Sequence, residues 1–522
     1  MLSLRKAIGL GVLFVLLLGT ACGAPAATKA PAATEAPSTE APAATEPPAF
    51  SAPQGAPGSQ YPNSNDEPYD MFFEDYGVNP SIDTEDDNLS TFALDVDTGS
   101  YTVMRSYLEE GNLPPPESVR VEEYINYFEQ GYPNPPAHQA FGIYVDGAPS
   151  PFTQTDRYQM LRIGIQGYQI PDEERKDASL TFVIDVSGSM DMDNRLGLVK
   201  RSLEILVERL RPTDTVSIVV YGSDARVVLE PTSGSDKGEI LSAIYGLHPE
   251  GSTNAEAGLR LGYRMAMEAY NPEGINRVIL CSDGVANVGN TEADVILAEV
   301  RGYVEEGVTL ATFGFGMDNY NDTLMEQLAD DGNGFYAYID DLDEASRLFA
   351  DRLTSTLQTI ALDAKVQVEF NPEVVSRYRL VGYENRAVAD DDFRDNAVDA
   401  GEIGAGHSVT ALYEIKLYPD AYGRVATVYL RWEDPDTHEV IEMSRDFESF
   451  EFAAEFREAD PYFQRAVIVA EYAEILKESY WAEGSSLSDV YREAQYVSEL
   501  LHREEAMDEL VELMGLARDI KD

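Results

Sequence analysis

Residues 178–358 alternate between short apolar segments and amphipathic stretches, and this order constrains the fold more than any other feature of the sequence. The segment 180–184 is apolar throughout, as expected of a strand that is buried on both faces, and apolar residues then recur at helical spacing over 196–210. Further strands are expected at 215–221, 227–229, 278–281 and 309–313, and further helices near 255–269, 293–305 and 321–329. This alternation predicts a doubly wound α/β fold, in which helices cover both faces of a mostly parallel sheet.

Segments with the alternating pattern of β-strands lie on both sides of the α/β region. They are expected at 141–145 and 160–166 before it, and at 365–370, 378–383, 408–417 and 425–431 after it. Residues 92–128 predict a strand, a turn and two helical stretches, and the chain after residue 460 is mostly amphipathic helix. We therefore expect an α/β domain inserted between β-rich regions that pair as one sandwich, followed by a helical C-terminal segment.

Residues 1–22 have the layout of an export signal. Two basic residues precede the apolar run 7–18, which is too short for a stable membrane span of roughly 20 residues. Cys22 follows small residues directly and resembles the lipid-modified cysteine of bacterial lipoproteins. Ordinary cleavage that leaves Cys22 unmodified is the alternative.

Residues 23–68 are rich in alanine, proline, threonine and glutamate, with near-repeats, and predict a disordered linker. Proline-rich chains favour extended polyproline II, so at about 3.1 Å per residue this segment could reach on the order of 140 Å. A lipid on Cys22 would then hold the folded part well clear of the membrane.

The charge of the chain excludes several classes of function. Acidic residues outnumber basic ones by 93 to 38, and the resulting net charge of −55 repels nucleic acid. With two cysteines and five scattered histidines the sequence offers neither a disulfide framework nor a zinc site, so any bound metal must use oxygen ligands. The P-loop pattern GxxxxGK and the hydrolase pattern GxSxG are absent, and an exported chain has no access to ATP, so we expect no nucleotide.

The strongest local pattern is D-x-S-x-S at Asp185, Ser187 and Ser189, directly after the first strand of the α/β region. Thr253 stands just before a predicted helix, and Asp283 follows another predicted strand. Open α/β sheets bind ligands at the carboxyl ends of their strands, where these side chains are expected to meet. Carboxylate and hydroxyl oxygens suit Mg²⁺ or Mn²⁺, so the pattern predicts a site for one divalent cation.

These residues resemble the von Willebrand factor type A domain and its metal-ion-dependent adhesion site. The resemblance implies that Asp185, Ser187 and Ser189 are ligands from a first loop, Thr253 from a second and Asp283 from a third, some of them acting through water. It also implies that one coordination position is left for an acidic group of a protein partner.

The flanking sequences resemble a family of bacterial surface lipoproteins. Residues 92–101 and 113–123 resemble the segment before the type A domain in that family, and residues 383–386 and 399–407 resemble the domain after it. The resemblance implies the architecture and no established reaction. The predicted parts are a lipoprotein signal peptide (1–22), a linker (23–68), an N-terminal flanking region (69–177), the type A domain (178–358), a β-rich C-terminal domain (359–455) and C-terminal helices (456–522).

Other interpretations of these motifs have less support in the sequence. Asp97 to Ser100 matches one active-site loop of aspartic proteases, but a second loop is missing, so we favour a turn after a short strand. A phosphatase would need a second aspartate where Ser187 stands. If Ser187 and Ser189 merely capped the following helix, Asp185 and Asp283 would face each other without a counter-charge, which is costly.

The leading hypothesis is therefore a lipid-anchored, extracytoplasmic binding protein of a bacterial membrane, facing the cell exterior or the periplasm, that engages an acidic protein partner through a divalent cation. In this interpretation the chain is not an enzyme and contacts the membrane only through its lipid. The alternatives are a structural envelope protein whose metal only stabilises the domain, and a metal-dependent hydrolase, which is disfavoured because no general base stands out.

Overall fold

The computed structural model describes residues 71–153, 155, 157–192, 195–284, 290–316 and 320–521. The chain divides into the units Met1–Asn63 and Ser64–Asp522, and all of the described residues lie in the second. The predicted signal peptide (1–22), its Cys22 and the linker (23–68) lie outside the described residues.

The α/β domain is built on a six-stranded sheet with the order β10-β9-β8-β5-β6-β7. All neighbours pair in parallel except β6 and β7, which are antiparallel. Every residue of the central strand β5 is buried, as its continuous apolar sequence predicts. The strands are β5 (Ala178–Asp185), β6 (Thr215–Tyr221), β7 (Ala225–Ser233), β8 (Ile275–Ser282), β9 (Thr309–Phe315) and β10 (Tyr336–Ile339).

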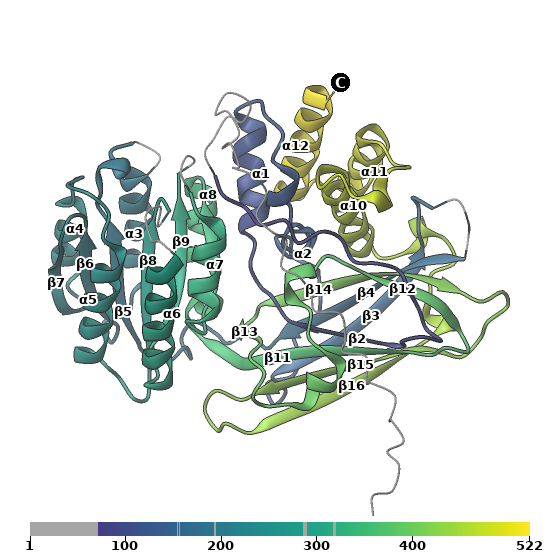
Figure 1. The fold of residues 1–522 in the computed structure, drawn as a ribbon, viewed down its shortest axis with the longest axis horizontal. Coiled ribbons are helices and arrows are strands. Elements are labelled where there is room, and N and C mark those ends of the chain that lie inside the picture. Colours follow the sequence, from purple (N-terminus) through teal and green to yellow (C-terminus); the bar gives the residue numbers. More distant parts are fainter. Residues whose placement is uncertain are drawn as a thin grey trace, which may run out of the picture. The chain divides into compact units, whose positions relative to one another are not determined.

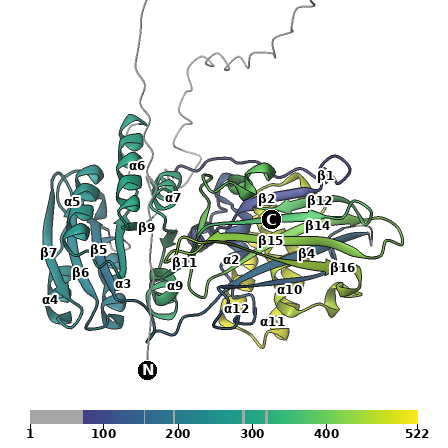
Figure 2. The same cartoon turned by 90° about the horizontal axis from the view of Figure 1, so that it is seen from below.

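Helices cover both faces of this sheet (Figure 2). On β5, Phe182 packs into the core beneath α3 and α4, whereas Val183 points to the opposite face and packs beneath α5 and α7. The structure confirms the predicted doubly wound fold, although α4 and the short strand β10 were not expected. The helices are α3 (Leu196–Arg209), α4 (Lys237–Tyr245), α5 (Ala255–Glu268), α6 (Asn290–Glu305), α7 (Asp322–Asp330), α8 (Leu342–Ser346) and α9 (Leu353–Leu357).

Two antiparallel sheets form the predicted sandwich, and each combines strands from before and after the α/β domain. One has the order β1-β12-β14-β4-β3; the other has β13-β11-β15-β16, with β2 also paired to β11. Their facing apolar side chains share one buried cluster, which includes Ile163 of β4 and Val366 of β11. The strands are β1 (Ile82–Asp83), β2 (Leu89–Ala93), β3 (Phe141–Pro149), β4 (Tyr158–Gly167), β11 (Thr359–Phe370), β12 (Val375–Val381), β13 (Gly401–Gly404), β14 (Ser408–Leu417), β15 (Arg424–Glu433) and β16 (Val440–Glu448).

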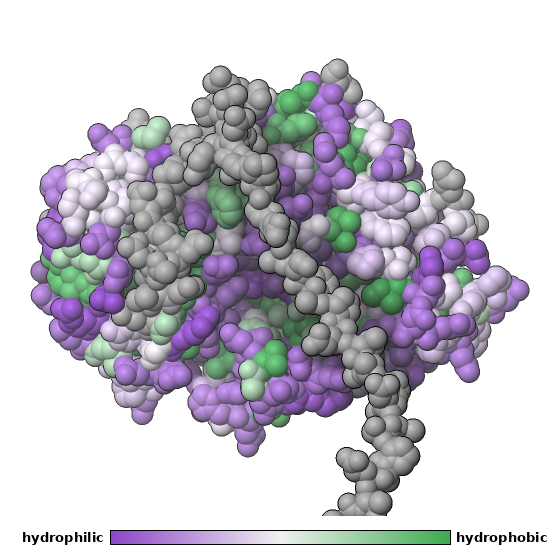
Figure 3. Space-filling view, viewed as in Figure 1, coloured by the Kyte–Doolittle hydropathy of each residue, from purple (hydrophilic) through white to green (hydrophobic). Residues whose placement is uncertain are grey.

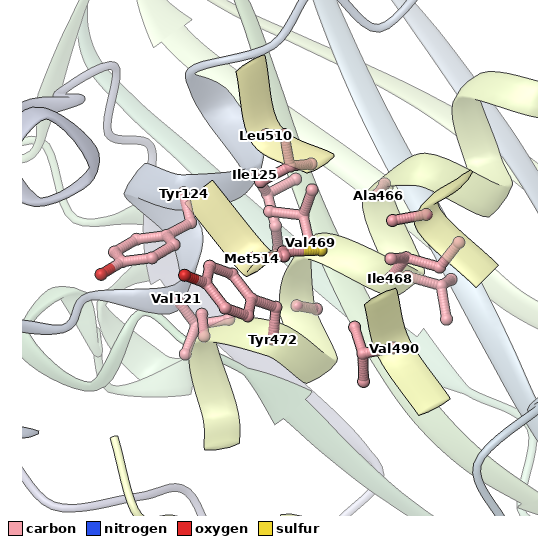
Figure 4. Close-up of a cluster of buried hydrophobic side chains, with 14 of the residues drawn as sticks. Val121, Tyr124, Ile125, Ala466, Ile468, Val469, Tyr472, Val490, Leu510 and Met514 are labelled. Atoms are coloured by element: carbon pink, nitrogen blue, oxygen red, sulfur yellow. The ribbon is translucent and has the colours of Figure 1, made fainter. Parts of the chain in front are cut away.

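Helices from the two ends of the described chain share another core. Helix α1 lies beside α12, and α2 lies beside α10 (Figure 1). Asp460 caps α10 by accepting hydrogen bonds from Tyr462 N and Phe463 N. Pro461 occupies the first turn, where proline is common because its missing N–H is not needed there. The helices are α1 (Gly99–Glu109), α2 (Val121–Asn126), α10 (Pro461–Leu476), α11 (Leu487–Leu500) and α12 (Glu505–Lys521). Figure 4 shows side chains of α2, α10, α11 and α12 gathered in this core, among them Val121, Ile125, Val469, Tyr472, Val490, Leu510 and Met514.

Short helical turns complete the description: η1 (Pro116–Ser118), η2 (Gly188–Met190), η3 (Arg347–Asp351), η4 (Glu384–Arg386), η5 (Asp390–Arg394), η6 (Ser449–Glu451), η7 (Phe456–Glu458) and η8 (Tyr480–Ala482).

The segment from Asp97 to Ser100 begins a helix and does not form the expected turn. Thr98 is the N-cap of α1, and Gly99 is the first helical residue. Asp97 Oδ1 accepts a hydrogen bond of 2.9 Å from Tyr336 N, so this carboxylate is tied to strand β10. A Cβ on Gly99 would lie 2.6 Å from Cε1 of Tyr336, which explains the glycine by close approach.

A buried charge cluster joins the N-terminal flanking region, helix α7 and the turn after β12. Arg120 lies 2.7 Å from Asp322 Oδ2 and 3.2 Å from Glu326 Oε2, and Arg386 lies 2.9 Å from Glu326 Oε1 and 2.7 Å from Asp330 Oδ2. Carboxyl groups outnumber guanidinium groups here. The cluster consists of Arg120, Arg386, Asp95, Asp97, Glu123, Asp322, Glu326 and Asp330.

The face drawn in Figure 3 is mostly polar, and its apolar residues form small separate patches. This agrees with the strongly acidic composition. Among the described residues, none of the helices combines the length and the apolar character that crossing a membrane requires.

Candidate metal centre

The first loop begins where β5 ends, with Asp185 fully buried. Its Oδ1 accepts a hydrogen bond of 2.7 Å from Ser187 N, which closes a tight turn around the carboxylate. The hydroxyl oxygens of Ser187 and Ser189 lie 2.9 Å apart. Neither serine caps helix α3, whose N-cap is Arg195, so the capping interpretation of this motif is wrong for that helix.

The second loop reaches the first through the backbone. Gly188 N donates a hydrogen bond of 3.1 Å to Gly251 O, and Glu250 N donates to Val186 O. Gly251 has φ +76°, a left-handed conformation that suits glycine. Thr253 follows two residues later, directly before Asn254, which caps α5. The structure therefore brings the Thr253 loop to the first loop.

The third loop follows β8. Ser282 Oγ donates a hydrogen bond of 3.2 Å to Asp185 Oδ2, and it also accepts one of 3.2 Å from Gly284 N. Asp283 is buried, with 4 % of its surface exposed. All three predicted loops thus meet at the carboxyl edge of the sheet, where parallel strands place their ligand-binding side chains.

Arg195 was missed as a member of this site. Its Nη1 donates a hydrogen bond of 2.8 Å to Asp283 Oδ2 and another of 2.9 Å to Ser189 O. The argument that the capping interpretation would leave Asp185 and Asp283 without a counter-charge therefore fails, because Arg195 supplies one. The sequence feature that could have indicated Arg195 is its place directly before the helix that follows the D-x-S-x-S motif.

Burial controls the protonation of both carboxylates. It raises the pKa of Asp185 to about 6, with the charge of Asp283 adding to the rise and the Ser187 amide opposing it. Burial also raises the pKa of Asp283, against the hydrogen bond from Ser189 and the charge of Arg195. Burial thus disfavours the charged form of both carboxylates, and a bound cation would favour it.

The donor set fits a hard divalent cation. Asp185, Ser187, Ser189, Thr253 and Asp283 offer carboxylate and hydroxyl oxygens from three adjoining loops, the ligand type that Mg²⁺ and Mn²⁺ prefer. Within the described ranges, no group of three or more histidine, cysteine, aspartate or glutamate side chains could hold a metal. A cation here would therefore depend on hydroxyl and water oxygens as well as on the two carboxylates.

Cys281 lies beside this centre without joining it. It is the penultimate residue of β8, it is fully buried, and burial raises the pKa of its thiol. A protonated, enclosed thiol is a poor nucleophile and a poor metal ligand.

Comparisons with known proteins agree with this architecture. A family profile described as von Willebrand factor type A domain matches residues 179–351. Two more profiles match the flanks, one described as von Willebrand factor at residues 67–162 and one described as uncharacterized protein YfbK, C-terminal, at residues 355–422.

Two curated relatives and one solved structure illustrate the similarity. The chain is 43 % identical over 352 residues to the uncharacterized protein YfbK of Escherichia coli (strain K12). The matched region covers 66 % of this chain and 61 % of YfbK. The chain is 30 % identical over 179 residues to inter-alpha-trypsin inhibitor heavy chain H4 of Homo sapiens. That matched region covers 33 % of this chain and 19 % of the human protein. The solved structure of von Willebrand factor type A from Catenulispora acidiphila is 16 % identical, covers 72 % of this chain and 90 % of that chain, and has a TM-score of 0.43.

The chain therefore contains a von Willebrand factor type A domain followed by a YfbK-type C-terminal domain. It spans less than two thirds of the length of the curated relatives named above. A type A domain suggests a role in protein interaction or adhesion.

Proposed function

We propose that this chain is a lipid-anchored, extracytoplasmic binding protein that engages a protein partner through a divalent cation, Mg²⁺ or Mn²⁺. Asp185, Ser187, Ser189, Thr253 and Asp283 hold the cation, and an acidic side chain of the partner completes its coordination. Cys22 carries the lipid, and the linker 23–68 sets the distance between the membrane and the binding domain.

Neighbouring residues orient the proposed ligands for the cation. The Ser187 amide and the Ser282 hydroxyl fix the two oxygens of Asp185, so this carboxylate is aimed before any cation binds. Ser187 and Ser189 present adjacent hydroxyl oxygens on the same loop. When bound, a divalent cation supplies a positive centre that attracts a carboxylate without any covalent step.

One observation carries the proposal: three loops that are distant in sequence meet around a buried and undercompensated carboxylate at the ligand-binding edge of an open sheet. Burial of two carboxylates at this edge is unfavourable on its own, and a bound cation would offset part of that cost.

Cation binding is tested by calorimetric titration of MgCl₂ and MnCl₂ into the wild type, Asp185→Ala and Thr253→Ala. Asp224→Ala is the matched control, because this exposed aspartate lies in the loop after β6 at the same edge but is not a predicted ligand. We expect Asp185→Ala and Thr253→Ala to lose cation binding and Asp224→Ala to keep it. Equal binding by Asp185→Ala and the wild type would refute the site.

Partner engagement is tested by affinity capture from envelope extracts with the same variants, with and without EDTA. The proposal requires a protein that is retained by the wild type, lost in EDTA and lost with Asp185→Ala. A partner that stays bound in excess chelator would rule out the cation bridge. If the cation raises the melting temperature but no partner depends on it, the metal is structural only.

The lipid anchor has a separate test. Cys22→Ala is expected to move the chain from the membrane fraction to the soluble fraction, because a lipidated cysteine is the proposed attachment. Unchanged membrane association of Cys22→Ala would refute anchoring through this residue.

A further inference from the structure

Arg195 is enclosed at the metal centre by several elements of the α/β domain. It lies directly before α3, and only 4 % of its surface is exposed. A Cβ on Gly316, in the loop after β9, would lie 2.5 Å from Arg195 Cγ, so that glycine leaves room for the arginine side chain. Gly316 has φ +80°, which itself favours glycine. The fold thus reserves a place for this guanidinium.

The contacts of Arg195 join two of the three loops. One nitrogen, Nη1, donates both to Asp283 Oδ2 in the third loop and to Ser189 O in the first. Hydrogen bonds between a charged donor and a carboxylate are stronger than neutral ones, particularly when both groups are buried. Arg195 therefore links the two loops in the way that a bound cation would, through Oδ2 of Asp283.

We infer that Arg195 is an internal cation of this centre: it holds the Asp283 loop against the first loop before a divalent cation arrives, and it lowers the affinity of the site for that cation. With Arg195 present, the formal charge of Arg195, Asp185 and Asp283 together is one unit less negative than that of the two carboxylates alone. The affinity of oxygen-ligand sites follows the number of charged ligands, so a neutralised aspartate gives a weaker site. This inference rests on the proposed cation site and assigns a positioning residue to it.

The consequence is a centre that assembles without metal and responds to changes in metal concentration. A site held together only by its cation would lose its loop arrangement whenever the cation left. Here the ion pair between Arg195 and Asp283 keeps the loops together, so binding and release of the cation need not disrupt the surface presented to a partner.

The test compares Arg195→Gln with the wild type. Glutamine keeps a hydrogen-bond donor but removes the charge, so we expect MnCl₂ and MgCl₂ to bind about tenfold more tightly in calorimetric titrations. In EDTA, Arg195→Gln is expected to melt at a lower temperature than the wild type, and Mg²⁺ should recover most of that loss. Arg195→Lys, which keeps the charge, should bind both cations with nearly wild-type affinity. Arg201→Gln is the matched control, since Arg201 is exposed on the same helix α3, and it should change neither quantity.

Cation affinity of Arg195→Gln that equals or falls below that of the wild type would overturn the inference. If Arg195→Gln fails to fold, the double variant Arg195→Gln/Asp283→Asn decides, because it removes both charges. Folding of the double variant supports an electrostatic role, whereas its failure shows that Arg195 acts by packing and overturns the inference. If Arg195→Gln binds cation and the wild type does not, the proposed function fails while the inference stands.

Discussion

Arg386 should be among the most sensitive positions for stability outside the metal centre. Its guanidinium contacts Asp95 at 3.2 Å, Glu326 at 2.9 Å and Asp330 at 2.7 Å, and only 13 % of its side chain is exposed. Arg386→Gln would remove this counter-charge from the buried Asp95 and would leave the buried Glu326 with Arg120 alone. Removal of one partner from a buried ion pair costs about 3–5 kcal/mol, so we expect the free energy of unfolding to fall by that amount at pH 8.

The assay is urea unfolding followed by tryptophan fluorescence, at pH 8 and at pH 5.5. Burial raises the pKa of Glu326 to about 7 and also raises the pKa of Asp330, so both groups take up protons in the folded protein as the pH falls. Protonated carboxyl groups need no counter-charge, and the cost of Arg386→Gln should therefore shrink at pH 5.5.

Arg394→Gln provides the control for this experiment. Arg394 also pairs with a carboxylate, Glu442 at 2.8 Å, but its side chain is 58 % exposed. Exposed ion pairs contribute about 0–1 kcal/mol, so this variant should change stability little. A loss below about 1 kcal/mol for Arg386→Gln at pH 8, or the same loss at both pH values, would refute the reasoning.

Three further outcomes are expected. In the wild type, burial raises the folded pKa of Glu123 from 4.5 to about 8 and that of Glu326 from 4.5 to about 7, so the folded protein holds more protons than the unfolded chain between these values. Stability is therefore lost as the pH rises through this range; the melting temperature should fall between pH 5 and pH 8, and a flat profile would contradict this. Cys281 should resist iodoacetamide in the folded protein and react only in denaturant, as peptide mass spectrometry can show. Gly401→Ala should lower the free energy of unfolding by roughly 1–3 kcal/mol in urea titrations, because its Cβ would lie 1.7 Å from Leu94 O; wild-type stability would count against this packing argument.

The elements that could be predicted from sequence are those whose pattern is set by burial. Strand β14 (Ser408–Leu417) was expected over the same residues, because its apolar positions follow one buried face. Strand β16 (Val440–Glu448) was missed, since it is an edge strand in which most side chains are at least partly exposed. Strand β10 (Tyr336–Ile339) is short, and its assignment depends on pairing with β9.

The candidate site also has parts that could be predicted from sequence and parts that could not. The positions of Asp185 and Asp283 follow from the rule that parallel strands bring their carboxyl ends to one edge, so their proximity could be expected from the strand pattern. The contact between Arg195 and Asp283 spans 88 residues and depends on room left by Gly316, which only the folded structure shows. Metal ligation by the five predicted residues stays a prediction.

The two ends of the α/β domain lie side by side, since Lys176 N donates a hydrogen bond of 2.9 Å to Gln358 Oε1. The α/β domain therefore leaves strand β4 and returns to strand β11 at neighbouring points, so it connects the two strands across a short distance. Loop-closure entropy depends on the separation of the ends and only weakly on what is inserted between them. Insertions within the type A domain could thus have accumulated without changing the register of the sheets on either side, provided that the contacts of α7 with Arg120 and Arg386 were kept.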